Sequence, residues 1–87
     1  RRLSAMAKEL ALHPVSSRLA RFLLSNAEED YPRRLWTQDA IAANIGTVRD
    51  VVGRLLRAFA EEGLIRRERG RMVVVDRAGL ERKAQGE

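Results

Sequence analysis

The sequence predicts an α+β fold of three to four helices with a small antiparallel β wing. Two patterns predict it. Between residues 37 and 62, Gly46 separates a short and a longer stretch in which apolar residues recur at helical spacing. After these, two β-prone runs at 64–65 and 72–75 flank a turn that contains Gly70. With 87 residues, 45% hydrophobic and 33% charged, the chain is large enough for one small packed core.

The first dozen residues predict the end of a helix. Leu3, Met6 and Leu10 share one face, and Pro14 ends the pattern because proline disfavours helical geometry in the residue before it. This apolar face either packs on its own domain or continues an upstream helix that pairs with a second subunit, and the sequence allows both.

The first core helix is predicted to start at Pro14, since proline is accepted in a first helical turn. Its apolar face comprises Val15, Leu19, Phe22 and Leu23. Tyr31 and Pro32 should stop it, and residues 33–36 are expected to form a short strand.

Two helices separated by a glycine turn are predicted next. Thr37 is a good N-cap, and Asp39 lies in the first turn, where a carboxylate favours the helix dipole. Gly46 supplies the backbone freedom for a tight turn. Thr47 is expected to cap a second helix over about residues 48–62, which the following glycine ends.

A two-stranded hairpin with a basic tip is predicted from residues 64–65 and 72–75, and Gly70 takes the turn. Asp76 can then cap a last short helix, which Gly79 should weaken.

The chain is basic, with 17 Lys plus Arg against 12 Asp plus Glu and a formal net charge of +5. Most of the cations are arginines, whose planar fork suits phosphate and guanine. The charge therefore permits a nucleic-acid partner without proving one.

Several function classes are excluded by composition. There is no cysteine, which removes disulfides, thiolate zinc sites, iron–sulfur clusters and a cysteine nucleophile. The only histidine, His13, precedes Pro14, so a metal cluster or a catalytic triad would have to be built at a chain bend. We therefore expect no enzyme activity, no metal and no cofactor in this chain.

No run approaches 18 apolar residues and no secretory leader opens the chain, so we expect a cytoplasmic protein.

The helix over about residues 48–62 carries the candidate function. Its buried face comprises Val52, Leu55, Leu56 and Phe59, and its opposite face comprises Arg49, Asp50, Gly53, Arg54 and Arg57. In a DNA major groove, arginine can bind guanine O6 and N7, and a carboxylate can accept from cytosine N4. Arg49, Asp50 and Arg54 are therefore the candidate base-reading residues, and Asp50 and Arg54 can also pair across one turn. A plain solvated helix face is the alternative.

The surroundings of this helix favour DNA over that alternative. A glycine inside a helix costs roughly 1 kcal/mol relative to alanine, so Gly53 indicates that something approaches the helix closely, and DNA backbone or a base edge would qualify. Six residues could contact DNA backbone: Thr37, Gln38, Thr47, Arg57, Arg69 and Arg71. Trp36 and Phe59 are predicted to be core anchors rather than base-stacking platforms.

The residues from 14 to 75 resemble the C-terminal winged helix-turn-helix domain of the Crp/Fnr bacterial transcription regulators. The resemblance is strongest in residues 37–42 (TQDAIA), 46–54 (GTVRDVVGR) and 62–65 (EGLI), followed by the RGR of residues 69–71. It implies that residues 14–87 are a DNA-binding domain and that residues 1–13 are the end of a dimerisation helix with a hinge. An effector-sensing β-barrel would precede Arg1.

By position, Arg49, Asp50 and Arg54 match the residues with which the family reads bases. Val48 and Val51 stand where members often have Ser and Thr, so two phosphate-binding hydroxyls are missing. The family resemblance also implies a homodimer that binds an inverted repeat in double-stranded DNA and regulates transcription.

A second hypothesis comes from another class of function. In it, the chain is a winged-helix protein-interaction module whose basic face docks on an acidic partner. The two arginines at positions 49 and 54, with Gly53 between them, suit a groove better than a flat protein surface.

Overall fold

The computed structural model describes residues 15–27 and 31–86. The predicted dimerisation helix and hinge over residues 1–13 therefore lie outside the described part of the chain. Within it, residues 15–26 are helical, and the further elements follow in the order η1 (Arg33–Trp36), α2 (Gln38–Ile45), α3 (Arg49–Glu61), β1 (Ile65–Glu68), β2 (Arg71–Val74) and α4 (Arg77–Ala84). The predicted α+β fold with a β wing, a winged helix-turn-helix, is confirmed.

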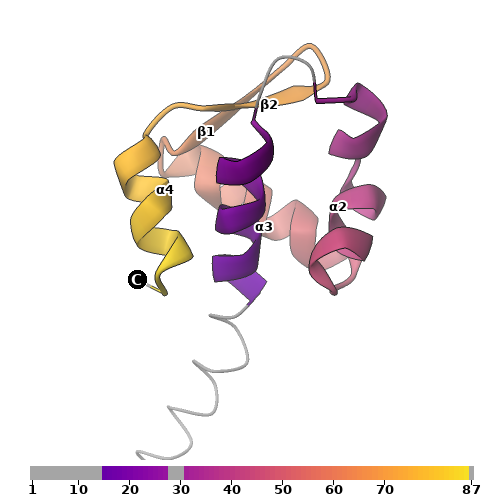
Figure 1. Cartoon of the computed structure of the whole chain (residues 1–87), viewed down its shortest axis with the longest axis horizontal. Helices are drawn as coiled ribbons and strands as arrows, with labels where there is room; N and C mark the ends of the chain where they lie inside the picture. Colours follow the sequence, from indigo (N-terminus) through magenta and orange to yellow (C-terminus); the bar gives the residue numbers. More distant parts are fainter. Residues whose placement is uncertain (1–14, 28–30, 87) are drawn as a thin grey trace, which may run out of the picture.

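In the described residues four α-helices surround one core, and the hairpin covers one end of it. In Figure 1 the helix over residues 15–26 lies in front of α3, with α2 and α4 on opposite sides and the hairpin across the top. The largest fully buried side chains are Phe59, Leu19, Leu23, Ile41, Leu80 and Val52. Trp36 is 3% exposed and Phe59 is 1% exposed, so both are core anchors as predicted. The core fixes α3 from its inner side.

The predicted caps of α2 and α4 are confirmed. The Thr37 hydroxyl oxygen accepts a hydrogen bond from the Ala40 N–H at 3.1 Å, and Asp76 Oδ1 accepts one from the Gly79 N–H at 3.0 Å. Gly46 ends α2 at a φ of 78°, which glycine adopts without strain. These local contacts set where α2 begins and where the turn to α3 occurs.

The predicted cap of α3 is wrong by one residue. The N-cap of α3 is Val48, which makes no side-chain capping bond, rather than Thr47. Thr47 instead belongs to the end of α2, because its N–H donates to the Ala42 carbonyl at 2.9 Å, as the Gly46 N–H also does.

Residues 33–36 are not the predicted strand but the 3-10 helix η1. Pro32, with its φ at −59°, starts the turn, and its carbonyl accepts from the Leu35 N–H at 3.0 Å. This turn buries Trp36 beside Phe22 and Tyr31, with ring centroids 5.8 Å and 4.7 Å away. The aromatic contacts outweigh the strand preference of the sequence.

The hairpin pairs Ile65 with Val74 and Glu68 with Arg71, which leaves Arg69 and Gly70 as a two-residue turn. Both have positive φ, 52° for Arg69 and 76° for Gly70, as the tightest hairpin turns require. The prediction that Gly70 takes the turn is confirmed, and Arg69 joins it in the left-handed conformation.

Gly79 occupies a position where a side chain has no room. A Cβ at this residue would lie 2.6 Å from both Asp76 Oδ2 and Leu64 Cδ2. Alanine usually favours a helix over glycine by about 1 kcal/mol, but here we expect Gly79→Ala to lower the free energy of unfolding by about 1–3 kcal/mol. Urea denaturation checks this, with the exposed neighbour Ala78→Gly as a control that loses only helix propensity. A more stable Gly79→Ala protein would contradict the close packing.

Candidate nucleic-acid interface

Helix α3 turns one face to the core and the other to solvent, as the sequence predicts. Val52 and Phe59 are buried on the inner face. The outer face carries exposed charged residues, namely Arg49, Asp50, Arg54 and Arg57. The structure therefore brings all three predicted base-reading residues together on the exposed side of one helix. Such a face can enter a groove without disturbing the core.

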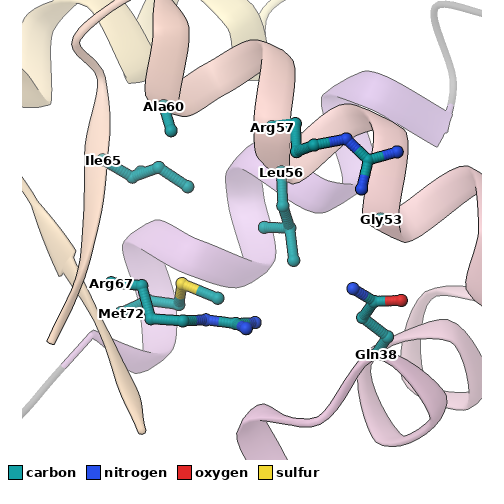
Figure 2. Close-up of a pocket in the computed structure, with 8 residues that line it drawn as sticks. All are labelled: Gln38, Gly53, Leu56, Arg57, Ala60, Ile65, Arg67 and Met72. Carbon is teal, nitrogen blue, oxygen red and sulfur yellow. The ribbon is translucent and has the colours of Figure 1, made fainter. Parts of the chain in front are cut away.

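Gly53 does not lie on this exposed face, and that expectation is wrong. Gly53 is buried, and a Cβ there would lie 3.1 Å from the side-chain oxygen of Gln38 in α2. Figure 2 shows the Gln38 amide pointing towards Gly53. The close approach that Gly53 permits is therefore between α2 and α3, not between α3 and DNA.

The expected Asp50–Arg54 ion pair is not among the ion pairs of residues 15–27 and 31–86. Instead, Arg49 Nη1 lies 3.7 Å from Asp39 Oδ2, and both side chains are mostly exposed. A surface pair of this kind contributes little to stability. The contact does place a predicted base-reading arginine beside the start of α2. The sequence indicated Asp39 only as a partner of the helix dipole.

A pocket of about 240 Å³ lies between α2, α3 and the hairpin. It is lined by Gln38, Gly53, Leu56, Arg57, Ala60, Ile65, Arg67 and Met72. In Figure 2 the polar ends of Gln38, Arg57 and Arg67 lie around apolar side chains of the core. These apolar side chains are Leu56, Ile65 and Met72. Two predicted backbone-contacting residues, Gln38 and Arg57, thus share one hollow with Arg67 of the wing.

The other predicted backbone-contacting residues are distributed around this hollow. Thr37 lies at the start of α2 with its hydroxyl oxygen engaged in the cap, and Thr47 is half-buried in the turn between α2 and α3. Arg69 and Arg71 line a separate hollow of about 340 Å³ with Arg33 and Glu68. The wing tip therefore shares this hollow with η1.

Arg33 and Arg34, which sequence reasoning did not assign to DNA, line a third hollow of about 640 Å³, which we call the arginine groove. It is lined by Arg33, Arg34, Trp36, Thr37, Gln38, Asp39, Arg49, Arg67 and Gly70. Because residues 33–36 were expected to be a strand, the first two of these arginines had no assigned place near α3. The run of two arginines before Trp36 was the available sequence signal.

Residues 17–83 match the family described as the Crp-like helix-turn-helix domain. The chain belongs to this family. The Crp-like domain is also similar to the crystal structure of the Thermus thermophilus catabolite activator protein, with a TM-score of 0.61 and 30% sequence identity. That similarity covers 98% of this chain and 38% of the other, so the Crp-like chain spans well under half of its structural neighbour. A search of curated proteins found no match.

The family and the fold of the Crp-like domain are those of DNA-binding regulators. No group of three or more His, Asp or Glu residues that could hold a metal ion occurs in the described ranges. Among the helices of those ranges, none has the length and apolar character needed to cross a membrane.

Proposed function

We propose that this chain is the sequence-specific DNA-binding part of a bacterial transcription regulator, and that α3 enters the major groove of double-stranded DNA. The observation that carries the proposal is the outer face of α3. It keeps Arg49, Asp50 and Arg54 exposed while a buried inner face holds the helix against a Crp-like core. A helix anchored in this way presents base-reading side chains in a fixed orientation.

In this proposal Arg49 and Arg54 bind guanine O6 and N7, and Asp50 accepts from cytosine N4. Phosphate contacts come from Thr37, Gln38, Thr47, Arg57, Arg69 and Arg71, which surround α3 or extend the wing. We further propose that the whole protein is a homodimer on an inverted repeat, with two copies of α3 one helical turn of DNA apart. A regulator of this kind acts in the cytoplasm, where the bacterial chromosome lies.

Selection of binding sites from a randomised duplex pool tests the proposal. The chain is mixed with the pool at moderate salt, and the bound fraction is sequenced. Enrichment of an inverted repeat supports a dimeric regulator, and enrichment of a single half-site supports a DNA-reading monomer. If the folded chain enriches no motif, base reading by α3 is wrong, and binding to an acidic protein partner becomes the better hypothesis.

The wing gives a prediction of its own. We expect Arg69→Ala to weaken binding to all duplexes similarly and to lower the slope of log K against log salt by about one unit, because one phosphate contact is lost. Arg69 has a φ of 52°, and alanine and arginine are both L-residues with a Cβ, so the substitution leaves the strain of this left-handed conformation nearly unchanged.

Titration of duplex binding at several salt concentrations measures this slope. Arg66→Ala is the matched control, because Arg66 Nε is already bonded to Glu68 Oε2 at 2.6 Å on the same hairpin. An unchanged slope in Arg69→Ala would remove Arg69 from the interface.

A further inference from the structure

We propose that the arginine groove binds the phosphodiester backbone of the DNA, with Arg33 and Arg34 of η1 and Arg67 of β1 as its phosphate-binding residues. This inference rests on the proposed function and assigns it a backbone-binding surface outside α3. The partner is the sugar-phosphate chain of a duplex next to the base-reading face.

The first argument is the position of the groove. Its walls come from η1, the start of α2, the start of α3 and the hairpin, so segments far apart in sequence line one hollow. Arg49 belongs both to this hollow and to the exposed face of α3. A duplex whose bases meet Arg49 therefore brings its backbone over the adjoining groove.

The second argument is the charge balance of the groove. Four arginines line it against one carboxylate, Asp39, and that carboxylate lies beside Arg49. No ion pair of the described residues uses Arg33, Arg34 or Arg67. Like charges gathered without counter-charges repel one another, and a polyanion with regularly spaced phosphates relieves that repulsion.

The third argument is that η1 is anchored and that its Arg33 side chain lies against the hairpin. A Cβ at Gly70 would lie 3.8 Å from Arg33 Cδ, so the side chain of Arg33 lies against the hairpin turn. Trp36, which follows this arginine pair in η1, is anchored in the core. η1 therefore presents its arginines from a fixed base, which reduces the ordering needed on binding.

The fourth argument is chemical. The first turn of α3 offers no hydroxyl to a phosphate, because Val48 and Val51 occupy its start, and Val48 is 62% exposed. An isopropyl group donates no hydrogen bond, whereas a guanidinium can make two parallel hydrogen bonds to one phosphate. Arginines beside α3 can therefore make the phosphate contacts that Val48 and Val51 cannot.

The test compares two double variants that lose the same charge. Arg33→Ala with Arg34→Ala removes the η1 cations, and Arg77→Ala with Arg82→Ala removes two exposed arginines of α4, on the opposite side of the molecule from α2. In duplex binding at several salt concentrations, we expect the η1 variant to lower the salt slope by about two units, one for each lost phosphate contact. The α4 variant should lower it by less than half a unit. Equal slopes in the two variants would overturn the proposal.

A second measurement uses duplexes in which one phosphate at a time is replaced by an uncharged methylphosphonate. The wild-type chain should lose affinity at two or three positions, and the η1 variant should show no further loss at those positions. If the η1 variant loses as much as the wild type at each position, Arg33 and Arg34 do not contact them. Circular dichroism of both variants verifies that these exposed substitutions leave the fold intact.

Failure of this inference is separable from failure of the proposed function. If the wild-type chain selects a DNA motif and the η1 variant keeps the wild-type salt slope, the arginine groove is wrong and base reading by α3 stands. If the wild-type chain binds no duplex, both are wrong. A poly-glutamate peptide that binds the wild type more tightly than a duplex would also overturn the inference in favour of an acidic protein partner.

Discussion

Replacing Phe59 by alanine is expected to lower the free energy of unfolding by about 3–5 kcal/mol, which is the usual effect of truncating a buried aromatic side chain. Phe59 is 1% exposed and lies on the inner face of α3. Lys83 of α4 lies over its ring, with the ammonium nitrogen 5.7 Å from the centroid. Since a domain of this size is stable by only about 4–13 kcal/mol, the variant should lose at least about a quarter of its stability.

Urea denaturation followed by circular dichroism measures this loss. Arg57→Ala is the matched control, because Arg57 lies two residues away on the exposed side of the same helix. It should change stability by no more than about 0.5 kcal/mol. A loss below about 1.5 kcal/mol in Phe59→Ala would mean that α3 does not depend on this anchor for its position.

The elements that the sequence predicted well are those governed by local chemistry. Thr37 and Asp76 cap their helices through their own side chains, and Gly46 and Gly70 supply left-handed backbone conformations at turns. Each of these roles depends on residues within a few positions of one another. The buried face of α3 follows equally from local periodicity, because one helical repeat decides which residues share a side.

The parts that the sequence did not predict depend on contacts between separate elements. The η1 turn forms because Trp36 packs against Phe22, which lies on another helix. The sequence analysis assigned the space beside Gly53 to DNA. That space is filled by Gln38 of α2, which lies fifteen positions earlier in the chain and which a local pattern does not place there. A helical wheel places a residue on a face, but it does not say which element of the same protein covers that face.

The candidate site also has one part that local sequence patterns predict and one part that depends on contacts between elements. The cations on the outer face of α3 could be grouped from one helical period, and the structure keeps that group. The arginine groove could not be predicted, since it combines η1 with the hairpin across more than thirty residues of sequence. The Asp39–Arg49 contact likewise needs the angle between α2 and α3, which no local pattern contains.

Arg49→Ala is expected to remove discrimination at one base pair of the selected site, at a cost of about 1–3 kcal/mol, or roughly a 5- to 150-fold loss of affinity. The loss should be largest for the selected sequence and small for duplexes already changed at that base pair, because only the matched guanine offers both acceptors. Affinities of the wild type and the variant for the selected duplex and its single-base variants measure the coupling between Arg49 and that base pair.

Asp39→Asn is the control for Arg49→Ala, since it keeps the arginine and removes the charge 3.7 Å away. We expect it to retain the base preference and to bind all duplexes somewhat more tightly, because one repulsive carboxylate near the phosphates is gone. Arg49 also lines the arginine groove, so a pure phosphate contact is the competing role. That role predicts an equal loss in Arg49→Ala on every sequence with a shallower salt slope, and this result would transfer Arg49 from base reading to the backbone.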